Sequence, residues 1–134
     1  MQQAAFSIVN YQFDKVSIDI EKQNSDEINL GFVTKGVYNN ESKSFELIFT
    51  VQVSNNNAQP FVSIRCKGIF KFSNINSFDE IPDFFYRNSI AILFPYVRAY
   101  LSLVTTQANI PGIILPTMNL SSLEGDLRKN TIQN

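Results

Sequence analysis

A long apolar helix followed by an apolar loop is the feature of this sequence that most restricts its fold. Over residues 90–106 the apolar side chains recur at steps of three and four, the period of an α-helix. They form two stripes: Ile90, Phe94, Val97, Leu101 and Val104 make the first, and Ile92, Tyr96, Ala99 and Leu103 make the second. A helix that is apolar on most sides must be buried on most sides. A sheet of the same chain can cover one stripe, and we expect a second copy of the protein to cover the other.

The same helix does not fit a membrane span. The unbroken apolar run over residues 90–97 is far shorter than the roughly 20 residues that a bilayer crossing requires. Pro95 and Arg98 interrupt the pattern, and a charge at the middle of a bilayer is costly. We therefore predict no membrane insertion. Arg98 on a buried helix would need a carboxylate, a carbonyl or a neighbouring subunit as its partner.

The part of the chain before the helix predicts four strands joined by turns. Apolar side chains occupy every second position of residues 45–53, which is typical of a half-buried antiparallel strand. Weaker patterns predict strands over residues 5–21, 28–38 and 61–72, and asparagines mark the turns. Strands followed by helices indicate an α+β fold, and the chain length suits a single domain over residues 1–134.

Local signals predict where the helices begin. Ser77 and Glu80 have the spacing of a capping box, which predicts a short helix over residues 78–86. The long helix is expected from about residue 89 to residue 106. It should kink at Pro95, because proline removes a backbone hydrogen bond.

The last part of the chain predicts a loop, a short helix and a tail. Prolines keep residues 108–118 irregular, although this segment is apolar and loops usually run over the surface. Asn119 is expected to cap a final short helix. The leucines on one side of that helix are Leu120, Leu123 and Leu127. The polar tail from Arg128 is expected to fray.

The composition argues against several kinds of function. The chain has no histidine, one cysteine and no glycine-rich phosphate-binding loop. We therefore predict that it is not an enzyme and holds no metal or other cofactor. A net charge of −1 offers no excess of cations to nucleic acid. Cys66 is expected in the core of a cytoplasmic protein, because it has no partner for a disulfide and the N-terminal residues do not resemble a signal peptide.

Several short motifs, in the same order and spacing, resemble the SecB protein-export chaperone family. They are Gly68-Ile69-Phe70, the run ILFPYVR over residues 92–98, Ile110-Pro111, and Leu115-Pro116 leading to Asn119-Leu120 and Leu123. The glycine motif is weak by itself, whereas the ILFPYVR run together with the spaced loop is more specific. A weaker similarity extends to residues 6–19, so the resemblance spans nearly the whole chain.

The resemblance implies a SecB-like fold with a four-stranded antiparallel sheet, followed by a long helix and a short C-terminal helix. It also implies a homotetramer built as a dimer of dimers. Proteins of this family hold unfolded or nascent polypeptides in hydrophobic grooves, without ATP, for protein export. By this resemblance the client-binding groove comprises Val62, Ile64, Cys66, Tyr96, Ile113 and Leu115. The oligomer interface comprises Phe94, Val97, Leu101 and Val104.

A contact with the motor protein SecA is also implied by the resemblance. In the family, acidic side chains on the sheet make this contact, and Asp19 keeps that charge here. Lys15 and Ser63 occupy two other positions that are acidic in the family, so we expect weak or absent SecA binding. Two alternatives to a general export chaperone are open. One is a dedicated SecB-like chaperone of a toxin–antitoxin system, and the other is an oligomeric interaction protein without chaperone function.

Overall fold

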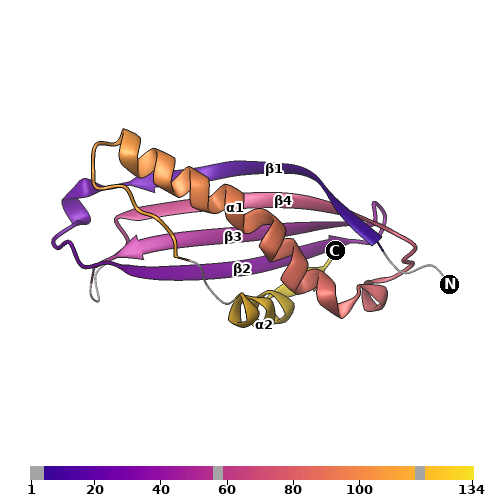
Figure 1. Ribbon diagram of the computed structural model, residues 1–134. Coiled ribbons are helices and arrows are strands. Elements are labelled where there is room, and N and C mark those ends of the chain that lie inside the picture. The colour runs from indigo at the N-terminus through magenta and orange to yellow at the C-terminus, as the bar shows by residue number, and fades with distance from the viewer. Residues whose placement is uncertain (1–4, 56–58, 117–119) are drawn as a thin grey trace.

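The computed structural model describes residues 5–55, 59–116 and 120–134, which form an α+β fold with one sheet (Figure 1). The strands are β1 (Ala5–Ile18), β2 (Asn29–Asn39), β3 (Ser44–Ser54), β4 (Val62–Ser73) and β5 (Thr131–Gln133). The helices are α1 (Asp83–Gln107) and α2 (Ser121–Lys129), with two short 3-10 helices, η1 (Ile20–Lys22) and η2 (Phe78–Glu80). Both α-helices lie on the same side of the sheet, with α1 running obliquely across it.

The order of strands in the sheet is β1-β4-β3-β2-β5. The contacts between β1 and β4, β4 and β3, and β3 and β2 are antiparallel, and β5 is parallel to β2. The predicted α+β fold is confirmed, with its four strands, its long helix and its short C-terminal helix. The fifth strand is not among those predicted.

This fifth strand makes the prediction of a frayed tail from Arg128 wrong. α2 continues through Arg128, and the residues after the helix pair with β2. The backbone N–H of Gly36 donates to the carbonyl of Asn130 at 3.3 Å, and that of Asn134 donates to the carbonyl of Tyr38 at 2.8 Å. Backbone hydrogen bonds of this kind leave no apolar pattern in the sequence, so periodicity could not reveal them.

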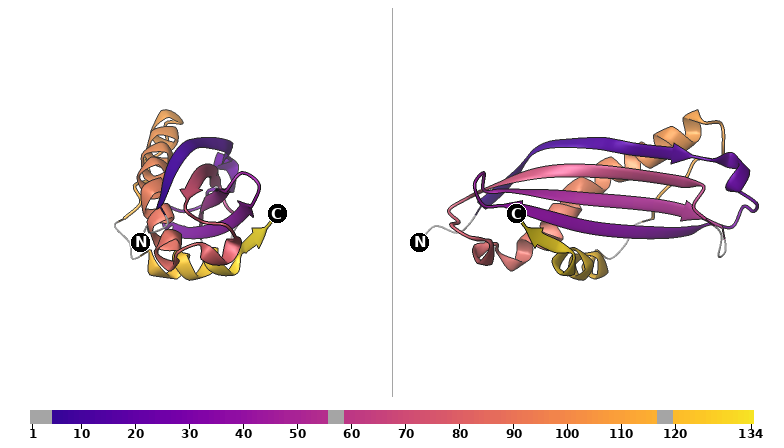
Figure 2. Two further views of the ribbon diagram at one scale, coloured as in Figure 1. Left: turned by 90° about the vertical axis from the view of Figure 1, so that its right-hand side faces the viewer. Right: turned by 180° about the vertical axis from the view of Figure 1, so that it is seen from behind.

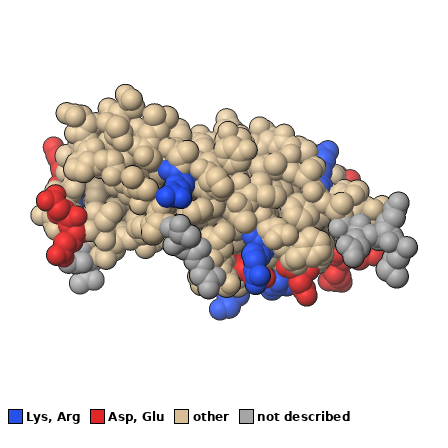
Figure 3. All heavy atoms as spheres, in the orientation of Figure 1, with Lys and Arg blue, Asp and Glu red and all other residues tan. Residues whose placement is uncertain are grey.

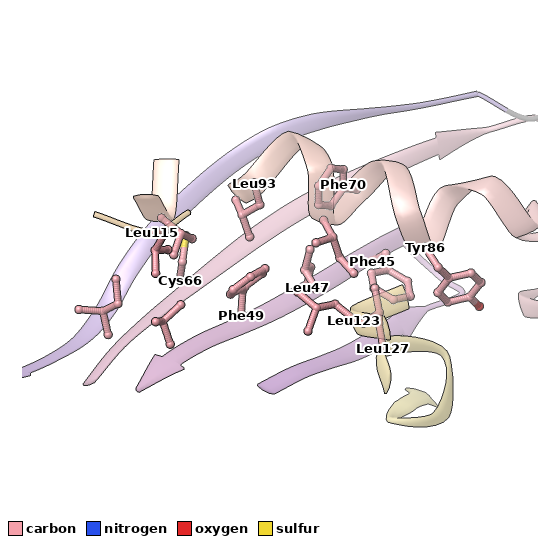
Figure 4. Close-up of a cluster of buried hydrophobic side chains, with 14 of the residues drawn as sticks. Phe45, Leu47, Phe49, Cys66, Phe70, Tyr86, Leu93, Leu115, Leu123 and Leu127 are labelled. Atoms are coloured by element: carbon pink, nitrogen blue, oxygen red, sulfur yellow. The ribbon is translucent and has the colours of Figure 1, made fainter. Parts of the chain in front are cut away.

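The hydrophobic core lies between the sheet and α1 (Figure 4). The predicted alternation on β3 is confirmed, since Phe45, Leu47, Phe49, Val51 and Val53 are all 0% exposed. The buried residues of α1 are Phe85, Tyr86, Ser89, Ile90, Leu93, Val97, Leu101 and Thr105. Phe85 is central to this contact, because its ring lies against Phe45, Phe70 and Phe72 with centroids 4.7, 5.5 and 4.7 Å away.

β1 is an edge strand with two irregularities in its register, one between Ile8 and Asn10 and one between Phe13 and Lys15. An extra residue at such a point changes the side of the sheet that the following residues face. Tyr11 and Phe13 therefore lie on the same α1 side as Ile8, although in a regular strand residues three and five positions after Ile8 would face the other way. This is why the first strand shows only partial alternation in the sequence.

The predicted helix boundaries near residue 80 are wrong. Ser77 makes no capping hydrogen bond through its side chain, and the carboxylate of Glu80 accepts instead from the backbone N–H of Asn76. Only the 3-10 helix η2 forms there, and α1 already begins at Asp83. The residues before position 89 are thus the first turns of the long helix rather than a helix of their own.

Pro95 lies inside α1, and the helix continues on both sides of it. Pro95 and Ala91 are both exposed on the outer side of the helix. Since proline leaves the carbonyl of the residue four positions earlier without its helical donor, the unpaired carbonyl of Ala91 can be satisfied by water.

The final helix is confirmed as α2. Leu123 and Leu127 are 5% and 0% exposed, and Leu120 is partly buried against the core. The buried hydroxyl of Thr34 on β2 donates to the carbonyl of Leu123 at 3.2 Å, which fixes the helix to the sheet. Asn119, the predicted cap, lies outside the described residues.

Gly36 on β2 faces the core, where a Cβ would overlap the ring of Phe45 on the neighbouring strand. Gly36→Ala should lower the free energy of unfolding by about 1–3 kcal/mol, because an overpacked core must shift. Gly31 of the same strand is a matched control, since its nearest atom would lie 3.9 Å from an added Cβ. Gly31→Ala should change stability by less than about 0.5 kcal/mol. Urea unfolding measures both, and equal losses would contradict this explanation.

Candidate functional site

Most of α1 outside its buried side is apolar and uncovered. By length and composition alone this helix of 25 residues could cross a membrane, a property that it shares with core helices of soluble proteins. Only 33% of its most apolar window is buried in the protomer, and Phe84, Tyr96 and Leu103 are exposed. Figure 3 views this side of the molecule and shows few charged groups across its middle, whereas acidic groups gather toward the ends. The surface is therefore suited to apolar partners.

A groove runs from the loop after α1 onto the outer side of the helix. Its first part is a hollow of about 320 Å³ whose apolar lining includes Ile28, Phe61, Ile110, Pro111, Ile113 and Ile114. Its second part is a hollow of about 360 Å³ lined by Phe94, Pro95, Arg98, Ala99, Ser102 and Ile114. Ile114 lines both hollows and is 67% exposed. We call this continuous surface the loop groove.

The loop that forms the groove is held in place by its neighbouring residues. The hydroxyl of Thr105, buried near the end of α1, donates to the carbonyl of Leu101 at 2.8 Å and accepts from the N–H of Ile113 at 3.0 Å. Ile113 and Leu115 point into the core and are 7% and 0% exposed. Because side chains alternate along an extended chain, Ile114 between them must point outward. The exposure of Ile114 is therefore a consequence of the burial of its two neighbours.

A second exposed apolar surface lies where β1 meets α1. Tyr11 stacks on Tyr96 with ring centroids 4.3 Å apart, and Phe13 stacks on Tyr100 at 4.1 Å. With Leu103, which is 54% exposed, these four rings form a surface that we call the aromatic edge. β1 is also an outer strand of the sheet, so among the described residues its outer backbone groups pair with no other strand.

The structure separates the six residues predicted to line the client groove. Tyr96 is 42% exposed on the aromatic edge, and Ile113 lines the loop groove. The other four are Val62, Ile64, Cys66 and Leu115, and none is more than 1% exposed. Their prediction as direct client contacts is wrong for this structure, because they lie in the core between the sheet and the segment that covers it.

The predicted oligomer interface also needs correction. Val97 and Leu101 are 0% exposed, because they lie on the side of α1 that packs on the sheet. They are therefore unavailable to a second copy, whereas Phe94 and Val104 are partly buried. Arg98, expected to need a partner on a buried helix, is exposed and forms no ion pair within the described part of the chain.

The positions that the resemblance relates to SecA lie on or next to the other face of the sheet. Lys15 and Ser63 lie on strands β1 and β4, and Lys15 is the Cα partner of Arg65. Asp19 follows β1, where its carboxylate accepts from the N–H of Glu21 at 3.2 Å. The SecA contact stays a prediction.

Four residues of these surfaces are absent from the predicted site. Tyr11, Ile28 and Ile114 are exposed, whereas Phe61 lines the loop groove but is only 1% exposed. Ile114 had a signal in the sequence, because two adjacent isoleucines in an extended loop cannot both face the core. Tyr11 had none, since the irregular register of β1 hides the face on which it lies.

The site offers apolar surface rather than reactive groups. Among the residues that the structure describes, no cluster of side chains could hold a metal ion. Burial raises the pKa of the Cys66 thiol to about 11, so the thiol is protonated and unreactive at neutral pH. The arrangement is therefore suited to binding.

Leu101 and Leu103 test which side of α1 belongs to the protomer core. Leu101→Asp places a charge without a partner in the core, which should lower the free energy of unfolding by about 3–5 kcal/mol. Leu103→Asp leaves its charge in water in the protomer. At protein concentrations low enough to keep the chain monomeric, the circular dichroism spectrum and urea midpoint should therefore stay close to those of the unmodified protein. The opposite ranking would mean that the orientation of α1 is wrong.

Cys66 serves as a reporter of opening. At pH 8 the thiol of the folded protein should react with an alkylating reagent at least about a hundredfold more slowly than that of the urea-unfolded chain, because burial disfavours the thiolate and blocks access. The rate should rise only with denaturant. Rapid alkylation of protein that keeps its native spectrum would show that the cover over β4 is open.

Comparisons with known proteins agree with this architecture. The chain is 32% identical over 114 residues to the uncharacterized protein MJ0357 of Methanocaldococcus jannaschii, which covers 81% of this chain and 73% of that protein. The fold of the present chain is similar to that of the SecB-like chaperone Rv1957 of Mycobacterium tuberculosis, with a TM-score of 0.61 and 12% identity. That chaperone was solved in complex with a ChAD peptide from the HigA1 antitoxin Rv1956. This match covers 85% of this chain and 91% of that chain. The family profile of the preprotein translocase subunit SecB matches residues 6–126, and the chain therefore belongs to the SecB family.

Proposed function

We propose that this protein is an ATP-independent holdase that binds unfolded or nascent polypeptide segments in the loop groove, in the manner of a cytoplasmic export chaperone. Membership of the SecB family supports a chaperone role. The observation that carries the proposal is the loop groove itself, with Ile114 held in water between two apolar hollows. The side chain of Ile114 is mostly exposed and adds little to the core, so its exposure supports a binding function.

Binding in the groove would remove apolar side chains of an unfolded client from water. Each fully buried aliphatic or aromatic side chain contributes about 1.5–3 kcal/mol, from which the cost of ordering the client must be subtracted. The walls of isoleucine, phenylalanine and proline offer few directional polar groups, so they select for apolar character rather than for one sequence. Neither binding nor release in this scheme requires ATP, because the bound fraction depends only on the concentration of the client and its affinity for the groove.

Self-association through the aromatic edge is part of the proposal. Tyr11, Tyr96 and Leu103 expose apolar surface next to the outer edge of β1, which is the kind of surface that a second copy can cover. We expect a homotetramer built as a dimer of dimers. A tetramer would carry several loop grooves, and one long client bound to more than one groove would gain avidity without a new kind of contact.

A dedicated chaperone of a toxin–antitoxin system is the second function that particular observations favour. The structurally similar chaperone of Mycobacterium tuberculosis was solved with an antitoxin peptide. In this chain Lys15 and Ser63 stand where the resemblance leads us to expect acidic contacts for SecA. Affinities for SecA and for several unrelated unfolded proteins separate the two roles. General export requires SecA binding and broad client binding, whereas one dominant partner would favour the dedicated role.

Ile114→Ser tests the loop groove. Losing the burial of one isoleucine should weaken the binding of an unfolded client about tenfold, measured as the chaperone concentration that half-suppresses client aggregation. Ile132→Ser is the matched control, because Ile132 on β5 is 61% exposed and is not among the residues that line the groove. This control should half-suppress aggregation at the same concentration as the unmodified protein.

Two results of this experiment would count against the proposal. If the unmodified protein suppresses no aggregation at any salt concentration, it is not a holdase, and an interaction protein without chaperone function takes its place. If the two serine variants lose activity equally, clients bind elsewhere on the surface. Because apolar burial is not screened by salt, client binding should also be nearly the same at low and high ionic strength.

A further inference from the structure

The face of the sheet opposite α1 is open (Figure 2, right). Among the described residues no helix lies over it, and its side chains are those that alternate with the core residues along each strand. On β3 and β4 these include Glu46, Ile48, Lys67 and Ile69, all of them partly exposed. The loop groove lies on the other side of the molecule, so whatever binds here is independent of a client in that groove.

Strand register places the cations of this face in adjacent rows. Lys15 on β1 is the Cα partner of Arg65 on β4. In the next row, Lys67 is the partner of Ile48, and Ile48 is the partner of Lys35 on β2. Neighbouring strands are about 4.8 Å apart, so Lys67 and Lys35 stand about 10 Å apart on the two sides of an isoleucine.

These cations outnumber the carboxylates around them. Between its turns the face carries five cations (Lys15, Lys35, Arg65, Lys67 and Lys71) against two carboxylates (Asp14 and Glu46), although the whole chain has a net charge of −1. We call this surface the basic face. Lys15, Lys35 and Lys71 are exposed, and none of them forms an ion pair with a carboxylate of the described residues.

Asp14 compensates part of this charge. Its carboxylate lies 2.5 Å from Nη2 of Arg65 and 3.6 Å from Nζ of Lys67. The hydrogen bond from Arg65 lowers the pKa of the Asp14 carboxyl to about 2, so the group stays charged throughout the neutral range. Lys15 still stands directly opposite Arg65, and like charges at opposed strand positions destabilise a sheet. An anionic partner would convert this repulsion into attraction.

The chemistry of the face fits an acidic polypeptide better than nucleic acid. Ile48, Ile69 and Val33 lie among the cations, and Asp14 and Glu46 would repel closely spaced phosphates. Duplex DNA carries a charge about every 1.7 Å, which an excess of three charges spread over four strands cannot match. Carboxylates at alternate residues of an extended chain repeat about every 6.8 Å, the same interval as the outward side chains of a strand.

We propose that the basic face is a docking surface for an extended, acidic segment of a partner protein. Carboxylates of the segment would pair with Lys15, Lys35 and Lys71, and its apolar side chains would lie over Ile48 and Ile69. The face lies apart from the loop groove, so partner and client can be held at the same time.

Fluorescence anisotropy with a labelled peptide of alternating glutamate and valine tests this proposal. The unmodified protein should bind the peptide more tightly in about 20 mM salt than in about 200 mM salt, because exposed charges are screened. The triple variant Lys15→Gln, Lys35→Gln, Lys71→Gln should lose about tenfold in affinity and most of the salt dependence.

A matched triple variant changes the net charge equally but away from the face. Lys22→Gln, Arg87→Gln, Lys129→Gln should bind the peptide within about twofold of the unmodified protein, since distant charges are screened. Asp14→Asn removes a carboxylate from the face and should tighten binding. Ile114→Ser should leave it unchanged, which separates a failure of this proposal from a failure of the holdase proposal.

Chemical shift mapping on the unmodified protein keeps the test independent of any variant. Addition of the acidic peptide should shift the amides of residues 63–71 and 33–37. Four results would overturn the proposal: no binding by the unmodified protein at low salt, equal losses in the two triple variants, shifts confined to α1 and residues 108–116, or equal or tighter binding of a lysine–valine peptide or an oligothymidylate of the same length. The last result with the oligothymidylate would assign the face to nucleic acid.

Discussion

The packing of one side of α1 against one face of the sheet is the contact on which the rest of the structure depends. Phe85 lies at its centre, between the aromatic rings of β3 and β4 and the ring of Phe6 on β1. This contact uses the inner residues of β1, β2, β3 and β4 and one side of the helix. Two large surfaces are left over as a result, the outer side of α1 and the outer face of the sheet, and no other helix formed by the described residues covers either of them.

The two uncovered surfaces differ in chemistry, and this difference suits them to different kinds of partner. The outer side of α1 and its loop are apolar, because prolines and isoleucines follow the helix and Thr105 holds the loop against the core. The outer face of the sheet alternates lysines and arginine with aliphatic residues. Apolar burial tolerates varied sequences and salt, whereas charge pairing requires a complementary pattern and weakens as salt rises. One small domain can thus combine an unselective surface with a selective one.

Sequence reasoning reached the fold and two residues of the candidate surfaces, Tyr96 and Ile113, but it misplaced other predicted site residues. The alternation on β3 and the apolar helix are long, regular patterns, and both were confirmed. The failures have a common origin, which is that the position of a side chain depended on a contact made elsewhere in the chain. Cys66 and Leu101 were assigned to binding surfaces, but α1 and β4 face each other, so both residues are buried. Ser77 matched a capping box, yet Pro82 delays the helix to Asp83.

The sequence by itself determined the class of fold, the excess of apolar side chains on the helix and loop, and the absence of histidine beside a single cysteine. These follow from composition and local periodicity, which no tertiary contact can change. The tertiary structure decided which apolar residues are core and which are surface. It turned Tyr11 and Phe13 toward α1 through the irregular register of β1, exposed Ile114 by burying Ile113 and Leu115, and gathered distant lysines into one face. Register and helix orientation are properties of paired segments, so they cannot be obtained from one segment alone.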